Sequence, residues 1–177
     1  FEPNKLLTRA HFSAFLARAM SLRAGDYTPD TRYNYFYENS VDERRTVLKF
    51  DRDYSMGTDI NTGWNLYDVL TNKHYESSGY SIANGQWSEG IAESSSGTFI
   101  DYPFTIGLKY DYLNNEIDEE KQEIIDTDAT YKIGGKDYEH VVIVRHTYKD
   151  STSNQPKFVT RHIYIAKHYG IIAYESD

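Results

Sequence analysis

"QEIIDTDATYKIGGKDYEHVVIVRHTY", residues 122–148, decides the fold class of this chain. Two runs rich in Val, Ile, Thr and Tyr flank Gly134-Gly135, and such runs on both sides of a glycine turn are typical of a β-hairpin. The polar segment 149–156 then leads to two more runs of this kind, 157–167 and 169–176. Because parallel strands need crossovers of about a dozen residues, these short connections predict antiparallel pairing.

The same alternation extends toward the N-terminus. Strand-like runs cover residues 31–38, 44–51, 63–70, 74–83, 86–94, 98–104 and 107–113. Asn84-Gly85 is a strong hairpin signal, and Pro103 favours an edge position or a break. The acidic segment 114–120 predicts a solvated turn. We therefore expect a mainly β fold of nine or so strands, a curved antiparallel sheet that is barrel-like or splits into a sandwich.

Composition limits the partners of this chain. Its 177 residues fit one domain of ordinary size, and it contains no cysteine and 17 tyrosines. The net charge of the whole chain is −8. Residues 1–23 carry four basic side chains and one acidic one, a net charge of +3, so the remaining residues have a net charge of −11. A domain this acidic is repelled by nucleic acid and by anionic membranes. No apolar run approaches the roughly 18 residues that cross a bilayer, so we expect no membrane insertion.

One helix precedes the predicted sheet. The segment "KLLTRAHFSAFLARAM", residues 5–20, places Thr8 as N-cap of an amphipathic helix over residues 8–22. Phe12, Phe15, Leu16 and Ala19 recur at helical spacing and form one apolar stripe. We expect this N-terminal amphipathic helix to be followed by a linker over residues 23–30 and a β domain over residues 31–177.

Residues 1–20 resemble the last third of an S-layer homology repeat. The shared features are a Phe-x-Pro-Asn segment at residues 1–4, Thr-Arg-Ala at residues 8–10, and the following Ala- and Leu-rich helix. The resemblance implies a module that holds a surface protein on the secondary polysaccharide of a Gram-positive cell wall, with Arg9 at the glycan-binding position. His11 departs from the family, which has Glu there. We expect the chain to begin inside a longer, extracellular protein.

The C-terminal strands have a looser resemblance. The pattern of residues 134–172, a glycine turn followed by valine-rich and isoleucine-rich strands, is similar to the closing strands of exported bacterial lipoprotein and cell-surface sheet domains. This resemblance implies an exported protein and no particular chemistry.

Histidines are concentrated in the last strands. Period-two alternation predicts that His140 and His146 share a face, and a hairpin folded about residues 149–156 brings His162 diagonally near His146, with Cβ atoms about 7 Å apart. These are weak metal candidates because no third ligand is visible, so we expect no metal and no cofactor. Arg145 and Arg161 are predicted to share the opposite face.

A second metal signal fails on its spacing. Residues 51–63 begin like a calcium loop, but Met56 stands where the loop needs Gly, and Thr62 stands where it needs a bidentate acid. A polar hairpin loop is the better interpretation of this segment.

No catalytic motif identifies an enzyme. The chain lacks a Gly-x-Ser-x-Gly elbow, a Ser-x-x-Lys pair and a cysteine nucleophile. Trp64 and Trp87 are candidates for stacking on sugar rings. We therefore predict a non-catalytic extracellular domain of a wall-anchored bacterial surface protein, structural or adhesive. The alternatives are a module that binds cell-wall glycan and a wall-active glycoside hydrolase whose two carboxylates the sequence does not identify.

Overall fold

The computed structural model describes residues 25–40, 42–57, 59–91, 97–114, 118–150 and 157–176. The predicted helix over residues 8–22, together with Arg9, lies outside these residues. The described part contains eleven strands, more than the nine or so expected, and one short 3-10 helix, η1 (Gly25–Tyr27). Every strand pair is antiparallel, so the prediction of a mainly β, antiparallel fold is confirmed.

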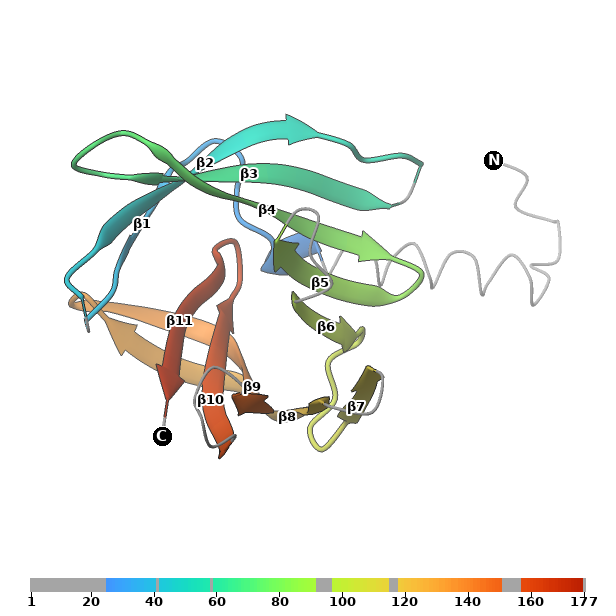
Figure 1. Cartoon of the computed structure of the whole chain (residues 1–177). Coiled ribbons are helices and arrows are strands. Elements are labelled where there is room, and N and C mark those ends of the chain that lie inside the picture. The colour runs from blue at the N-terminus through green and yellow to red at the C-terminus, as the bar shows by residue number, and fades with distance from the viewer. Residues whose placement is uncertain are drawn as a thin grey trace, which may run out of the picture. The chain divides into compact units, whose positions relative to one another are not determined.

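The described chain divides into two compact units, and the first contains residues 31–103. It holds a six-stranded sheet in which each strand pairs with the next one along the chain (Figure 1). Its strands are β1 (Tyr35–Glu38), β2 (Arg45–Asp53), β3 (Ile60–Asp68), β4 (His74–Ala83), β5 (Gln86–Ile91) and β6 (Gly97–Asp101). This up-and-down order follows from the short polar loops between the strands.

The second unit contains residues 27–30 and the chain from Phe104 onward. Its five-stranded sheet also follows sequence order and consists of β7 (Lys109–Asn114), β8 (Asp118–Ile133), β9 (Lys136–Asp150), β10 (Lys157–Ala166) and β11 (Gly170–Ser176). Tyr27 packs edge-on against Phe104, with ring centroids 5.1 Å apart. The choice between a barrel-like sheet and a sandwich stays a prediction, as do the boundaries at residues 22, 30 and 31.

Two glycine turns form where the sequence predicts them. Asn84 and Gly85 have φ angles of 54° and 76°, and the turn between β8 and β9 has φ angles of 59° at Gly134 and 78° at Gly135. Positive φ at both central residues belongs to the type I′ turn, whose twist matches that of paired strands. These two hairpins are therefore determined locally.

The prediction of a solvated turn over the acidic segment 114–120 is wrong in part. Asp118–Glu120 begin β8, and Asp118 pairs with Asn114 of β7, so this part of the segment is strand and not turn. Strand propensity depends strongly on context, and a run of poor strand formers is carried here by pairing with a neighbour. The prediction for Pro103 is confirmed, since β6 ends at Asp101 and is an edge strand of its sheet.

Each sheet has a buried apolar face. In the first unit Ile82, Trp87 and Ile100 lie opposite one another on β4, β5 and β6, and each is at most 1% exposed. In the second unit Ile124, Val144 and Ile163 form the equivalent row across β8, β9 and β10, and all three are fully buried. Burial of such rows is the main contribution to the stability of each sheet.

Candidate functional site

A polar row follows directly after the apolar row of the five-stranded sheet. His146 on β9 lies between Gln122 on β8 and Arg161 on β10, two residues along from the buried Val144. His146 is 4% exposed and Gln122 is 1% exposed, so both are buried polar side chains. Buried polar groups need partners, and the contacts of this row therefore define what it can do.

His146 contacts a charged side chain at each ring nitrogen. Arg161 Nε donates a hydrogen bond to His146 Nδ1 at 3.0 Å. On the other side, His146 Nε2 lies 2.6 Å from Glu120 Oε1, a close polar contact without ideal hydrogen-bond alignment. Because Nδ1 accepts from Arg161, the network assigns the proton of the neutral ring to Nε2, which faces the carboxylate.

Glu120 is held as a carboxylate. The contact with His146 lowers the pKa of Glu120 below its ordinary value and outweighs the opposing effect of burial. Gln122 Nε2 also donates to Glu120 Oε1, at 3.2 Å. An ionised carboxylate, a neutral imidazole and a guanidinium therefore lie side by side in the order Glu120, His146, Arg161.

Two tyrosine rings flank the guanidinium of Arg161. Its central carbon lies 5.3 Å from the ring centroid of Tyr148 on β9 and 5.1 Å from that of Tyr174 on β11. Both distances are within the range of cation–π attraction. The side chain is therefore held by one ring from each neighbouring strand and by its bond to His146. We call Glu120, Gln122, His146, Tyr148, Arg161 and Tyr174 the Arg161 cluster.

This arrangement favours binding over proton transfer or metal ligation. A histidine acts as a general base or a metal ligand through a free nitrogen lone pair, and Arg161 occupies the lone pair of His146. Among the described residues, no group of three His, Cys, Asp or Glu side chains is arranged to hold a metal ion. Among the described residues, the terminal donors of Arg161 have no hydrogen-bond partner, and Gln122 Oε1 is a buried acceptor without one.

His162 lies on the other face of the sheet. Register places it directly opposite Arg145 on β9 and Glu175 on β11, while Arg161 is the residue opposite His146. The predicted pairing of His146 with His162 is therefore wrong, and so is the shared face of Arg145 and Arg161. The actual register differs by one residue from the expected one, and such a slip moves every side chain of a strand to the opposite face.

His140 also departs from the expected alternation. It has a φ angle of 55°, and Val141 and Val142 after it are both fully buried, so strict alternation along β9 is interrupted here. His140 Nδ1 lies 2.6 Å from Asp128 Oδ1, and both side chains are exposed. His140 is therefore not part of the cluster around His146.

Trp64 and Trp87 are core residues. They are 1% and 0% exposed, and the ring of Trp64 packs edge-on against Tyr35 and Phe50. Neither indole offers a face to a ligand, so the prediction that they stack on sugars is wrong. The cause is that a strand has two faces, and composition does not tell which one is buried.

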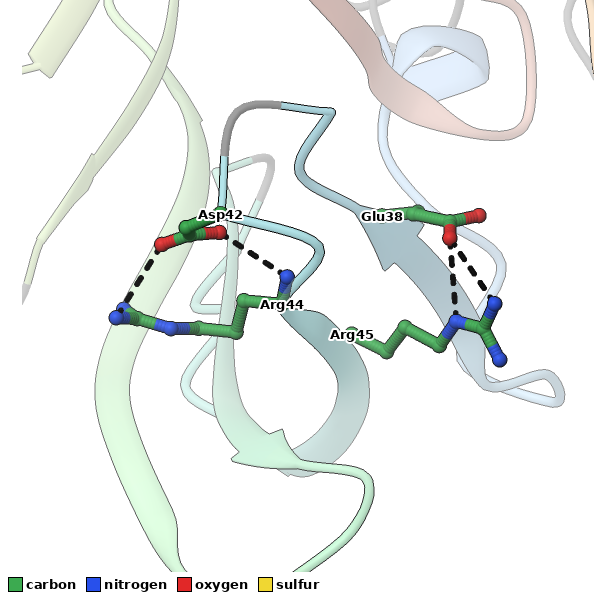
Figure 2. Close-up of polar contacts among 4 residues, drawn as sticks. All are labelled: Glu38, Asp42, Arg44 and Arg45. Carbon is green, nitrogen blue, oxygen red and sulfur yellow. Dashed lines mark hydrogen bonds and ion pairs between the residues drawn. The ribbon is translucent and has the colours of Figure 1, made fainter.

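The exposed ion pairs at one end of the six-stranded sheet are not a site. Figure 2 shows Arg45 beside Glu38 and Arg44 beside Asp42, at distances of 3.1 Å and 3.3 Å. All four side chains are at least 42% exposed, and exposed pairs of this kind contribute about 0–1 kcal/mol. They support the hairpin between β1 and β2.

Sequence reasoning singled out His146 and missed its partners. Glu120 lies in the segment predicted to be a turn, and Arg161 was expected on the other face. Period-two spacing could have shown that Glu120 and Gln122 share one face of their strand, and that Val159, Arg161 and Ile163 share one face of theirs. Only the register places both of these faces beside His146 on β9.

Comparison with known proteins supports the fold. No family model matches the chain, and no curated protein matches its sequence. Among the described residues there is no helix with the length and apolar character needed to cross a membrane. A crystal structure of a Bacteroides fragilis protein, described as a candidate exported protein with a YmcC-like fold, is similar with a TM-score of 0.51 and 13% identity. The similarity covers 81% of this chain and 85% of that one, so the two chains share a fold.

Proposed function

We propose that this chain is a non-catalytic domain of an exported protein and that it works outside the cytoplasm. The observation that carries the proposal is the fold shared with the Bacteroides fragilis protein, which is described as a candidate exported protein. The Arg161 cluster supports the non-catalytic part, because the nitrogen lone pair of its one histidine is occupied by Arg161.

The N-terminal segment supplies the finer part of the proposal. Residues 1–20 resemble the end of an S-layer homology repeat, and we propose that the intact protein uses this region, with Arg9, to bind the wall polysaccharide of a Gram-positive cell. The β strands that follow then form a structural or adhesive body at the cell surface.

Protease accessibility on intact cells tests the export. Cells that produce the protein are treated with a protease that does not enter them, and the chain is followed with an antibody raised against residues 25–177. We expect the chain to be digested while a cytoplasmic marker survives. Survival of both, with release of the chain only after lysis, contradicts export.

Wall extraction tests the finer part. The intact protein is compared with its Arg9→Ala variant and with Arg18→Ala, a control that removes the same charge from the same predicted helix. We expect Arg9→Ala to weaken retention on purified walls and Arg18→Ala to leave it unchanged. Equal retention of all three proteins, or equal retention after the wall polysaccharide has been stripped, contradicts polysaccharide anchoring.

A further inference from the structure

We propose that Arg161, held between Tyr148 and Tyr174, binds the carboxylate of an acidic sugar. The inference deepens the proposed function, on which it rests in taking the ligand to be an extracellular glycan. It assigns a ligand class and a site to the five-stranded sheet, separate from the N-terminal segment.

The first argument is the missing counter-ion. Arg44, Arg45, Arg52 and Arg145 each form an ion pair with a carboxylate. Arg161 donates instead to a neutral imidazole, and in the part of the chain that the structure describes its terminal nitrogens have no hydrogen-bond partner. Among the described residues no carboxylate forms an ion pair with this half-buried guanidinium, so part of its desolvation cost is not recovered there, although the chain carries a net charge of −8. An anionic ligand supplies the ion pair that the described residues do not form with Arg161.

The second argument is preorganisation. The bond from Nε to His146 and the two flanking rings restrict the rotation of a side chain that otherwise loses considerable entropy on binding. The bond through Nε leaves both terminal nitrogens, which form a planar fork, without a hydrogen bond to the described residues. A planar fork matches the two oxygens of a carboxylate in a bidentate contact.

The third argument is the aromatic surface beside the fork. Tyr174 is 52% exposed although its ring is fixed against Arg161. Tyrosine combines a flat apolar face with a polar end, and a sugar ring offers a matching flat face with hydroxyl groups. A ligand that carries a carboxylate on such a ring uses the arginine and the tyrosine together, whereas a free carboxylate uses only the arginine.

Glu120 sets the charge requirement of the site. Its charge acts on Arg161 through space, but its close contacts are with His146 and Gln122, so it forms no ion pair with the guanidinium. Its charge still opposes an anionic ligand. The variant Glu120→Gln keeps an acceptor for His146 while removing this repulsion, and we expect it to bind the ligand more tightly.

The test is a titration of the full chain with three soluble probes: galacturonate oligosaccharides, their methyl esters and a phosphorylated oligosaccharide of similar length. We expect the galacturonate probe to bind and its methyl ester to bind roughly tenfold more weakly, because the ester loses the charge-assisted contact. The phosphorylated probe is expected to bind more weakly than the galacturonate. Binding of the ester or the phosphorylated probe as tightly as galacturonate overturns the assignment of a carboxylate ligand.

Variants locate the site. Arg161→Gln is expected to weaken galacturonate binding roughly tenfold, and Arg161→Lys nearly as much, because an ammonium group keeps the charge but not the fork. Arg52→Gln removes the same charge from an exposed arginine of the other sheet and is expected to leave binding unchanged. Circular dichroism confirms that each variant is folded, and Arg161→Lys makes the smaller change to the cluster.

Three outcomes overturn the proposal: no galacturonate binding by the unaltered chain, equal weakening by Arg161→Gln and Arg52→Gln, or weaker binding by Glu120→Gln. None of them bears on protease accessibility or on the Arg9 variant. Failure of this inference is therefore distinguishable from failure of the proposed function.

Discussion

Arg161 and His146 lie directly opposite each other on β10 and β9, and Arg161 Nε donates to His146 Nδ1 at 3.0 Å. The arginine thus occupies the nitrogen that a catalytic or metal-binding histidine would use. This single bond joins the buried end of the row to the half-exposed guanidinium. It is the contact on which the proposed binding of an anionic ligand depends.

Removal of the imidazole should destabilise the second unit. We expect His146→Ala to lower the free energy of unfolding by about 2–3 kcal/mol, because it leaves a cavity and removes an acceptor from Arg161. Urea denaturation followed by circular dichroism measures the loss. His162→Ala, a half-buried histidine on the other face, is the matched control and should cost less than about 1 kcal/mol. Equal losses for both variants contradict the register.

Engineered cysteine pairs test the same register by chemistry. The chain has no cysteine of its own, so every crosslink reports the introduced pair. Arg145→Cys with His162→Cys should crosslink on oxidation, since directly opposite residues have Cα atoms about 4.5–5.5 Å apart. His146→Cys with His162→Cys should not, because their Cβ atoms point to opposite faces. Mass spectrometry after thiol labelling distinguishes the two pairs, and a crosslink in the second pair alone refutes the register.

Gly97 begins β6 where no side chain fits. A Cβ atom there would lie 2.5 Å from the carbonyl oxygen of Glu89, so the backbone has to shift in Gly97→Ala. We expect a loss of about 1–3 kcal/mol, typical of overpacking. At Gly79 the nearest atom would be at 3.6 Å, an ordinary contact, and Gly79→Ala should be close to neutral. Tryptophan fluorescence follows this unfolding, because Trp64 and Trp87 both lie in the first unit. Similar losses at both glycines contradict the close approach.

A carboxylate held by two phenols makes stability depend on pH. Tyr131 and Tyr164 donate to the two oxygens of Glu175 at 2.5 Å and 2.6 Å and hold its pKa below the ordinary 4.5. The unfolded chain therefore binds the proton first, and the stabilisation, complete above about pH 4.5, is lost as the pH falls through the folded pKa. Glu175→Gln should make the fall in unfolding free energy below pH 5 shallower. An unchanged dependence of the unfolding free energy on pH below 5 would show that Tyr131 and Tyr164 do not hold the Glu175 carboxylate.

The alkaline side has the opposite sign. Burial and the bond to Glu175 raise the pKa of Tyr131 from 10.0 to about 12. The neutral phenol is thus favoured in the folded chain, so its contribution is complete below pH 10 and is lost as the pH rises toward 12. Absorbance of phenolate against pH should show an ionisation near pH 12 in the unaltered chain that is lost in Tyr131→Phe. The same absorbance change near pH 12 in both proteins contradicts this.

The sequence by itself determined most of the strands and the two glycine hairpins. Asn84-Gly85 and Gly134-Gly135 need positive φ at both central residues, and this is a property of the residues themselves. Alternation of apolar and polar residues located most strands for an equally local reason, and β4 has the predicted bounds. The acidic start of β8 escaped detection because its pairing with β7 overrides its propensity.

Only the tertiary structure decided which side chains meet. The polar segment 149–156 does not specify the register of β9 and β10, and with a side-chain period of two a difference of one residue exchanged Arg161 for His162 beside His146. In the same way, alternation placed Trp64 and Trp87 on a face without revealing that this face is the core. Local sequence determines where strands lie because turns and alternation are short-range properties. Long-range pairing determines the Arg161 cluster because its members come from four separate strands.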